Sequence, residues 1–386
     1  MNNQTSNIQT DSINLHRLHQ GKMEIKPTVP VTNLAELAIA YTPGVGAVCS
    51  EIAKNPDLAN QLTIKKHSVA VISDGSAVLG LGNIGPLGAL PVMEGKSIIF
   101  KTFANIDAWP IVLNVHTTEE IVQTIKAISP GFGGINLEDI AAPQCFEVEE
   151  QLMDLGIPVM HDDQHGTAVV VYAGLQNACK VLGKKFSELK VVINGAGAAG
   201  LATAKMLLDY EKTGSERVKS LILCDSKGII SKNRSDLNKY KNQILELSNL
   251  ENQEGSLEEA LKAADVFIGL SVAGALKPEM VKSMNTNPII FALANPVPEI
   301  YPEEAYQAGA GIVGTGRSDF PNQINNALVF PGVFKAALQQ NHQKITAKMK
   351  YQAALAIAAT VEPKRDQILP DLFNSNLVEN IVKAIG

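Results

Sequence analysis

The stretch "VVINGAGAAGLATAKMLL", Val191–Leu208, joins a short apolar run to an amphipathic run through a turn with three glycines. Gly195 permits a tight turn, Gly197 lets the backbone approach a pyrophosphate, and Gly200 lets a following helix pack closely on the strand. A diphosphate would lie on the free N–H groups at the start of that helix. The pattern predicts a dinucleotide-binding turn, with an empty structural turn as the alternative. Its candidate cofactor-binding residues are Gly195, Ala196, Gly197, Ala198, Ala199 and Gly200.

Asp225 closes the next apolar run, "SLILCD", within reach of the position expected for a ribose-binding acid. Its carboxylate would accept hydrogen bonds from the ribose hydroxyls of adenosine and repel a 2′-phosphate, which favours NAD. Lys232 and Arg234 follow closely, and these cations would accommodate the phosphate of NADP. We therefore expect NAD as the cofactor and keep NADP as an open alternative.

Short apolar runs alternate with helical patterns over nearly the whole chain. Several runs are apolar on both faces, which is typical of parallel strands covered by helices on both sides. The predicted strands span residues 68–74, 109–115, 132–138, 157–162, 189–195, 220–225, 265–270, 288–293 and 310–315. The fold class is therefore α/β, with two domains built on parallel-rich sheets. The second is a Rossmann-type domain with C-terminal helices from Pro331 onward, and the boundary near residue 163 gives domains 1–163 and 164–386.

Composition narrows the class of protein. The chain has 386 residues, 45% hydrophobic and 19% charged, which favours two soluble domains. A net charge of −6 and a pI near 5.7 argue against nucleic-acid or anionic-membrane partners. Four scattered cysteines without metal-like spacing indicate reduced thiols, so we expect a cytoplasmic protein. The first twenty residues are polar and lack the apolar core of a signal peptide, and we expect a flexible or partner-draped arm.

Two acidic pairs follow successive predicted strands. Glu138 and Asp139 end one strand, and Asp162 and Asp163 end the next. If those strands are neighbours, four carboxyl groups converge on one cleft, because ligand sites in open α/β sheets lie outside the carboxyl ends of strands. Carboxylates are the ligands that Mg²⁺ and Mn²⁺ prefer. The pairs predict a divalent-metal site, with simple capping of the following helices as the alternative.

His161 and His165 flank the second acidic pair and are four residues apart. On one helix that spacing is typical of zinc sites. Here one histidine ends a strand and the other begins a helix, so the spacing carries little weight. We expect hydrogen-bonded structural histidines.

Lys96 and Tyr41 are the remaining candidates for chemistry. Lys96 lies in the apolar, glycine-rich stretch "GPLGALPVMEGKSIIFK", where a lowered pKa would suit a general base. Tyr41 precedes Pro43 at a predicted helix end, where its phenol could donate a proton into a cleft. An ordinary surface lysine and a buried structural tyrosine are the alternatives.

Seven motifs in one order resemble those of malic enzymes, specifically the compact bacterial type. They extend from roughly residue 35 to 335, and together they are far more specific than any one alone. The motifs are "YTPGVG" (41–46), "SDGSAVLGLGNIGPLGALPVMEGK" (73–96), "INLEDI" (135–140), "HDDQHGTA" (161–168), "INGAGAAG" (193–200), "FALANP" (291–296) and "NNALVFPG" (325–332).

The resemblance implies metal-dependent oxidative decarboxylation of L-malate to pyruvate and CO₂ with NAD or NADP. It implies Lys96 as the general base, Tyr41 as the general acid that protonates enolpyruvate, and Asp162 as the partner of the lysine. It further implies Glu138, Asp139 and Asp163 as ligands of Mn²⁺ or Mg²⁺, Thr167 and Asn295 as cofactor contacts, and Lys96, Asn295 and Asn326 as substrate contacts. The family also suggests a homodimer.

One position departs from the larger family members, which carry an arginine two residues after "DG" where this chain has Ala77. The compact bacterial members share that absence, so the partner of the malate C4 carboxylate stays open. Three other functions remain as alternatives. They are malolactic decarboxylation of malate to lactate, an amino-acid dehydrogenase with a catalytic lysine, and a non-catalytic dinucleotide-sensing protein.

Overall fold

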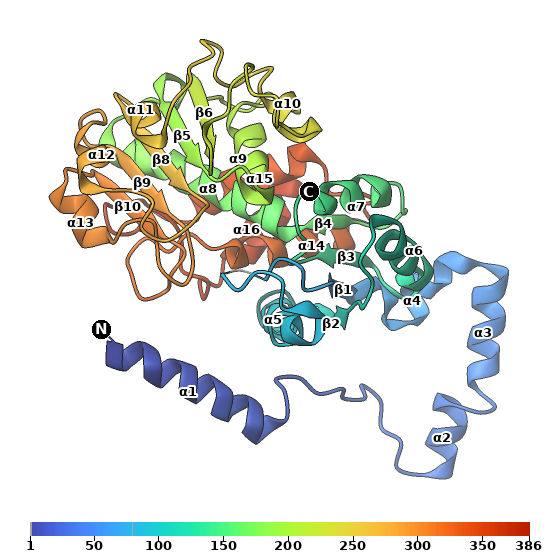
Figure 1. The fold of residues 1–386 in the computed structure, drawn as a ribbon. Helices are drawn as coiled ribbons and strands as arrows, with labels where there is room; N and C mark the ends of the chain where they lie inside the picture. The colour runs from blue at the N-terminus through green and yellow to red at the C-terminus, as the bar shows by residue number, and fades with distance from the viewer. Residues whose placement is uncertain (1, 79) are drawn as a thin grey trace.

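Two mainly parallel β-sheets organise the protein, one in each half of the chain (Figure 1). The computed structural model describes residues 2–78 and 80–386, with side chains from Ile8 onward. Met1 and Leu79, which lie inside stretches considered above, fall outside the described residues.

The first sheet has the strand order β2-β1-β3-β4, and all of its pairings are parallel. Its strands are β1 (Ser68–Ser73), β2 (Asp107–Val112), β3 (Gly134–Leu137) and β4 (Val159–His161). Every residue of β1 and β3 is buried, as their continuous apolar patterns predict. Because β3 and β4 are neighbours, the acidic pairs that follow them meet at one edge of the sheet.

The second sheet has the order β10-β9-β8-β5-β6-β7. Its strands are β5 (Lys190–Asn194), β6 (Ser220–Asp225), β7 (Gly228–Ile229), β8 (Val266–Gly269), β9 (Ile289–Ala292) and β10 (Ile312–Thr315). The chain leaves β5 on one side for β6 and then crosses to β8 on the other side, which creates a topological switch point at β5. All nine predicted strands are present. The antiparallel β7 was not predicted, because two residues carry no periodic signal.

Helices connect the strands of both sheets, and α1, α2 and α3 lie before the first strand. The longer ones are α1 (Asn2–His19), α3 (Val45–Lys54), α5 (Gly85–Ile99), α6 (Thr118–Ile128), α7 (Gln144–Leu152), α8 (Asp162–Leu182), α9 (Ala198–Leu207), α14 (Phe330–Gln339), α15 (Ala347–Ala359) and α16 (Leu377–Ile385). The shorter ones are α2 (Leu34–Ala40), α4 (Ala59–Leu62), α10 (Lys239–Ile244), α11 (Leu257–Leu261), α12 (Pro278–Lys282) and α13 (Pro302–Gln307). The single-turn elements are η1 (Pro56–Leu58), η2 (Ile64–His67), η3 (Phe100–Ala104, a π-helix), η4 (Ser129–Gly131), η5 (Phe186–Glu188) and η6 (Asn326–Leu328).

Helix α8 links the two units. It begins with Asp162 and Asp163, whose negative charges suit the positive end of a helix dipole. It ends at Gly183, whose φ of 65° is the left-handed conformation typical of a glycine C-cap. The helix therefore starts at the acidic edge of the first sheet and then packs against α9, next to the second sheet.

The C-terminal helices, which were expected from Pro331 onward, return to the first unit. Phe330 and Phe334 of α14 stack against Phe100 of η3, with ring centroids 4.7 and 5.4 Å apart. Buried residues of both halves form one continuous hydrophobic cluster. The two units are thus tied together by packing as well as by α8.

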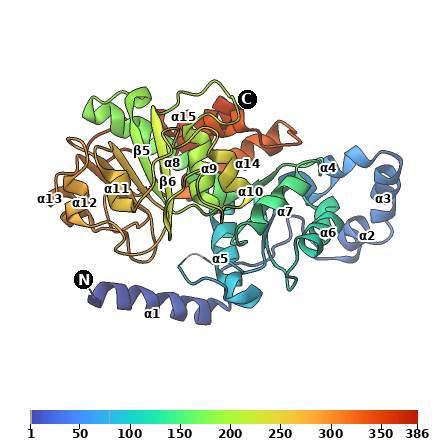
Figure 2. The same cartoon turned by 45° about the horizontal axis from the view of Figure 1, so that its top comes forward.

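The N-terminal region forms a regular helix, α1, and a flexible or partner-draped arm stays a prediction. His16, Arg17 and His19 lie in its last turn, where positive charge is favourable. Figures 1 and 2 show α1 beside α5 but apart from the two units, and α2 and α3 at the outer end of the first unit. Among the described residues, no helix has both the length and the apolar character needed to cross a membrane.

Candidate active site

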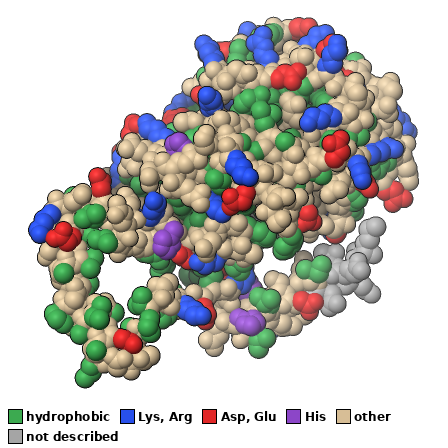
Figure 3. Space-filling model, turned by 180° about the vertical axis from the view of Figure 1, so that it is seen from behind, with side chains coloured by type: hydrophobic (Ala, Val, Ile, Leu, Met, Phe, Trp, Pro, Cys, Tyr) green, Lys and Arg blue, Asp and Glu red, His purple; other side chains and the backbone are tan. Residues whose placement is uncertain are grey.

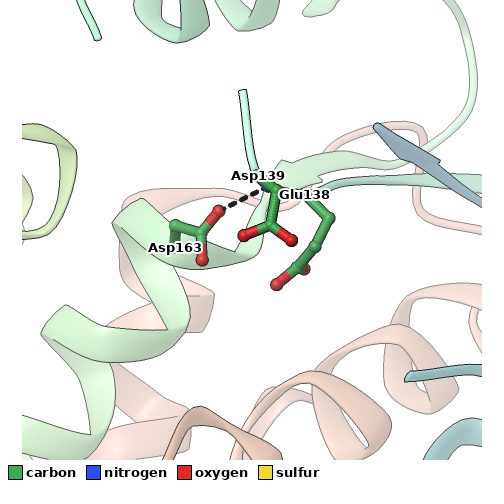
Figure 4. A group of neighbouring side chains, drawn as sticks. All are labelled: Glu138, Asp139 and Asp163. Atoms are coloured by element: carbon green, nitrogen blue, oxygen red, sulfur yellow. Dashed lines mark hydrogen bonds between the residues drawn. The ribbon is translucent and has the colours of Figure 1, made fainter. Parts of the chain in front are cut away.

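Three carboxylates from two elements gather at the carboxyl edge of the first sheet (Figure 4). Glu138 and Asp139 follow β3, and Asp163 lies in the first turn of α8. One oxygen from each residue lies within 4.8 Å of the others. The backbone N–H of Asp139, whose φ is 54°, donates to Oδ2 of Asp163 over 2.8 Å and fixes the two chains relative to one another.

The cluster fits a hard divalent cation. Glu138 and Asp139 are each only 2% exposed, and burial raises the pKa of Glu138 well above its usual value, with the charge of Asp163 as the next cause. Buried like charges repel one another strongly unless a cation lies between them. Three converging carboxylates are a donor set that Mg²⁺ and Mn²⁺ prefer.

Lys96, near the end of α5, lies directly beside this cluster. Its Nζ atom is 3.0 Å from Oε1 of Glu138, donates a short hydrogen bond to Oδ2 of Asp162, and lies 4.5 Å from the ring centroid of Phe330. The amide of Asn136 donates to the other oxygen of Glu138 over 3.1 Å. The side chain of Lys96 is buried and ion-paired, so the alternative of an ordinary surface lysine is wrong.

The pKa of Lys96 is not lowered as the sequence predicts. Burial acts to lower the pKa of Lys96, but the charges of Asp162, Glu138 and Asp163 outweigh burial and raise it. Sequence reasoning considered the apolar neighbours of the lysine and not the carboxylates that the fold brings to it. A cation held by those carboxylates would oppose their effect on the ammonium.

Asp162 is completely buried, and its position depends on Gly166 one turn later in α8. A Cβ atom on Gly166 would lie 2.0 Å from Oδ1 of Asp162 and 2.9 Å from Cβ of Asn326. The carboxylate therefore occupies space that only glycine leaves open. Burial raises the pKa of Asp162, while Lys96 acts to lower it.

The two histidines lie behind the carboxylates rather than among them. Among the described residues, the group that could hold a metal ion contains neither His161 nor His165. The Nε2 atom of His165 is 2.8 Å from Glu149, which also accepts the backbone N–H of His161. The prediction of a hydrogen-bonded structural histidine holds for His165. It fails for the ring of His161, which is buried without a hydrogen-bond partner and lies 3.8 Å from Asp163.

Two further candidates, Asn326 and Thr167, lie near the site, whereas Tyr41 does not. Asn326 in η6 packs at Gly166, next to Asp162, and Thr167 lies one helical turn after Asp163 on the same face of α8. Tyr41 does not join the site, because its side chain is 65% exposed at the end of α2. The alternative of a buried structural tyrosine is therefore wrong as well.

Asn295 lies where the two units meet. It follows β9, and its backbone oxygen would be 2.5 Å from a Cβ atom on Gly80, which belongs to the glycine-rich loop before α5. That loop also contains Ala77, whose N–H donates to the backbone oxygen of Asp139 over 2.9 Å. Asn295 of the second unit thus contacts the loop that binds Asp139.

The glycine turn has the geometry expected for a dinucleotide site. Gly195 has a φ of 119°, and a Cβ there would lie 2.2 Å from the backbone oxygen of Leu270. A Cβ on Gly200 would lie 1.8 Å from the oxygen of Gly195, so both glycines are sterically required. Around Gly197 a Cβ would meet open space, directly before the first residue of α9. This is the position where backbone can approach a pyrophosphate.

Asp225 is held by two cations at the end of β6. Arg234 donates to both of its oxygens over 2.8 and 3.0 Å, and Lys241 donates over 2.6 Å. Partial burial acts against ionisation, but these hydrogen bonds lower the pKa of Asp225 to about 2. Lys232, which was expected near the phosphate, contributes only its backbone N–H to Asn252 among the described contacts.

Sequence reasoning missed four residues that shape the site. Phe330 and Asn136 contact Lys96 and Glu138, Gly166 makes room for Asp162, and Lys241 shares Asp225 with Arg234. The position of Gly166 one turn after Asp162 was the one available signal. Asn136 lies only two residues before Glu138, at the end of β3. The contacts of Phe330 and Lys241 join segments that are distant in sequence or separated by an irregular loop.

The parallel sheets, the switch point and the glycine turn define an α/β enzyme of the dinucleotide-dependent oxidoreductase class. The chain belongs to the malic enzyme family. The family model "Malic enzyme, N-terminal domain" matches residues 20–153, and "Malic enzyme, NAD binding domain" matches residues 164–385.

Individual relatives agree with the family models. The chain is 50% identical to the "Bifunctional malic/malolactic enzyme" of Bacillus subtilis, over 98% of this chain and 92% of the relative. It is 51% identical to an "NAD-dependent malic enzyme" of Geobacillus stearothermophilus, over 95% of this chain and 76% of the relative. The crystal structure of an NAD-dependent malic enzyme from Thermotoga maritima matches with a TM-score of 0.92 and 49% identity, over 97% of this chain and 98% of that one.

Proposed function

We propose that the protein catalyses the oxidative decarboxylation of L-malate to pyruvate and CO₂, with reduction of NAD(P) and a bound divalent cation. The observation that supports this proposal is the contact of Lys96 with both Glu138 and Asp162, beside a group of carboxylates that could hold a metal ion. A 2-hydroxy acid that chelates the cation would present its hydroxyl group to that lysine.

Lys96 would hold and move the proton of the substrate. When neutral, its Nζ would accept the proton of the C2 hydroxyl as the C2 hydrogen leaves as hydride for the nicotinamide. Asp162 would orient the ammonium that results and stabilise its charge. Glu138, Asp139 and Asp163 would hold Mn²⁺ or Mg²⁺, which when bound supplies a Lewis acid for ketone formation and for loss of the C4 carboxylate.

The substrate would lie between the two units. Asn326 packs beside Asp162, and Asn295 meets the glycine-rich loop whose Ala77 binds Asp139. We propose that these two amides position the substrate carboxylate and the nicotinamide. The open backbone at Gly197 and the start of α9 would bind the pyrophosphate, and Asp225 would face the adenosine ribose with NAD as the expected cofactor.

In this proposal, the boundary between the substrate domain and the cofactor domain lies near residue 163. We assign the substrate and the metal to residues 1–163 and the cofactor to residues 164–386. All four cysteines are free thiols, so we place the protein in the cytoplasm, which cell fractionation tests.

Product analysis tests the reaction. With L-malate, NAD or NADP, and Mn²⁺, pyruvate and reduced cofactor should form in equal amounts. A product without carbon–carbon cleavage, or no turnover with either cofactor, would contradict the proposal. An amino-acid dehydrogenase would instead oxidise amino acids at full rate in EDTA.

A malolactic reaction is the second candidate, because the relative from Bacillus subtilis is named for both activities. It would convert malate to lactate and CO₂ on the same scaffold, with the cofactor reduced and reoxidised in one cycle. Lactate would then accumulate without net growth of absorbance at 340 nm. Measuring lactate and pyruvate in the same reaction separates the two outcomes.

A further inference from the structure

A cavity of about 290 Å³ lies on the side of α8 that faces away from the candidate active site. Residues of α7 in the first unit and of α8, α9, α10 and α15 in the second line it. In α8, Gln164 and Ala168 line the cavity, whereas Asp162, Asp163 and Gly166 belong to the active-site side. At about 100° per residue, these two sets point to opposite sides of the helix. The cavity and the carboxylate group are therefore separated by the width of α8.

The walls of the cavity are mainly apolar. Small-molecule sites combine such walls with a few polar groups that fix the orientation of the ligand, and their volumes are roughly 300–1,000 Å³. This cavity lies at the lower end of that range, so it suits a small ligand with an apolar body. The apolar side chains come from all the larger elements around it and include Met153, Val169, Leu201, Met206 and Ile345.

Two lysines line the cavity without an acidic partner at close range. Within the part of the chain that the structure describes, neither Lys205 of α9 nor Lys350 of α15 forms an ion pair. On the face of the protein in Figure 3, by contrast, Lys and Arg side chains lie among acidic ones over much of the body. Burial lowers the pKa of Lys350, although the charge of Glu149 acts to raise it. An anion beside this lysine would stabilise its charged form.

Most of the acidic side chains around the cavity are already engaged. Asp209 accepts hydrogen bonds from the loop after α9 over 2.7–3.1 Å, and Glu150 lies 3.7 Å from Lys239, which does not line the cavity. Glu149 holds the start of α8. Glu211 is the one acidic residue of the lining that makes no ion pair or hydrogen bond with the described residues. Two lysines against one such carboxylate favour an anionic ligand.

Glu149 connects the wall of the cavity to the carboxylates of the candidate metal site. Its Oε1 atom accepts the backbone N–H of His161 over 2.9 Å, and its Oε2 atom is 2.8 Å from Nε2 of His165. The ring of His161 in turn lies 3.8 Å from Asp163. A ligand that displaces Glu149 would therefore move the end of β4 and the first turn of α8, which position Asp163.

We propose that this cavity is an effector site for a small amphiphilic acid. The carboxylate of the acid binds Lys205 and Lys350, and its apolar body packs against the walls. Through Glu149, the bound acid changes the affinity of the carboxylate group for its divalent cation. By linkage, the cation changes the affinity for the acid by the same factor. This inference rests on the metal site of the proposed function.

Octanoate is the probe for binding, and octan-1-ol is its neutral counterpart. Isothermal titration calorimetry of the full chain should detect octanoate with a Kd below about 1 mM and weaker binding of the alcohol. Lys350→Met should weaken octanoate binding at least about tenfold, because it removes the cation and keeps an apolar side chain. Lys348→Met, at an exposed lysine of the same helix outside the cavity, is the matched control.

Thermal unfolding checks that each variant is folded, and Lys205→Met is the second variant if Lys350→Met is not. No binding of octanoate, or equal affinities in the cavity variant and in Lys348→Met, overturns the proposal.

The effector role is tested on Mn²⁺ binding, measured by calorimetry with and without saturating octanoate. The Kd for Mn²⁺ should change at least about fivefold. Ala347→Phe, which fills the cavity from the first residue of α15, should abolish this change, whereas Lys348→Met should keep it. An unchanged Kd for Mn²⁺ overturns the effector role.

Neither measurement depends on turnover, so failure of the proposed function is recognised separately. Absence of malate oxidation in a protein that shows both effects would refute the proposed reaction and leave the effector site in place. Failure of Mn²⁺ to bind the octanoate-free protein would refute the metal site, and with it the coupling.

Discussion

The Nζ atom of Lys96 lies 3.0 Å from Oε1 of Glu138, so the proposed base contacts one of the three carboxylates that could hold a metal ion. Asp162 holds the same ammonium from the side of α8. A cation bound by the carboxylates would therefore change the pKa of the lysine. The proposed proton transfer and the proposed metal binding would then depend on one another.

Lys96→Ala should reduce kcat for malate oxidation by at least about a hundredfold, because it removes the group that accepts the hydroxyl proton. Cofactor binding should persist, since the glycine turn lies on the other unit, and fluorescence titration with NADH measures it. Lys101→Ala, an exposed lysine paired with Asp107, is the control and should retain turnover. Equal rates for the two variants would refute the assignment of Lys96 as the base.

Asp163→Ala should raise the Mn²⁺ concentration needed for half-maximal activity at least about tenfold more than His161→Ala or His165→Ala. The carboxylate of Asp163 belongs to the group that would bind the ion, whereas the two histidines lie behind the carboxylates and outside that group. The measurement is the Mn²⁺ dependence of the rate for each variant. Similar shifts in all three variants would indicate that the histidines are also ligands of the ion.

Gly166→Ala should lower kcat sharply and the free energy of unfolding by about 1–3 kcal/mol, because the new methyl group overlaps the carboxylate of Asp162. Gly131→Ala is the matched control, since a Cβ there meets open space and its φ is not positive. Thermal unfolding and initial rates measure the two effects. A Gly166→Ala enzyme that behaves like the control would show that Asp162 does not depend on this space.

Asp225→Ala should raise the ratio of kcat/KM for NADP to that for NAD at least about tenfold, because it removes a repulsive carboxylate and releases Arg234 and Lys241 for a 2′-phosphate. Asp154→Ala, an exposed aspartate paired with Lys344, should leave the ratio unchanged.

Since hydrogen bonds outweigh burial and hold the pKa of Asp225 at about 2, the carboxylate is charged at any higher pH. Protonation of Asp225 should therefore not change the wild-type ratio above about pH 4. Since the 2′-phosphate of NADP itself gains a proton near about pH 6, the variant and the wild type are compared at about pH 8. An unchanged ratio in Asp225→Ala at that pH would mean that another group sets cofactor choice.

The sequence predicted the sheets, the glycine turn and the convergence of the acidic pairs. These follow from local patterns, because a buried parallel strand and a glycine-rich turn each leave a signature within ten residues. The neighbouring positions of β3 and β4 were the only assumption needed to bring Glu138 and Asp163 together. Family resemblance then separated the roles of the two adjacent aspartates.

What the sequence could not predict depends on contacts between distant segments. The pKa of Lys96 is set by carboxylates from β3 and α8, and the partners of Asp225 come from an irregular loop and α10. The exposure of Tyr41 at the end of α2 was likewise not predictable from its motif. A motif identifies such residues but does not say which neighbours they meet.

We expect the proposed chemistry at Lys96 to need a divalent cation held by Glu138, Asp139 and Asp163. Malate oxidation is measured before EDTA treatment, after removal of metal, and after return of Mn²⁺, as reduction of NAD and of NADP. Turnover should disappear with the metal and return on adding Mn²⁺, while NADH binding should not change. Full activity in the metal-free enzyme would show that the carboxylates do not act through a bound cation.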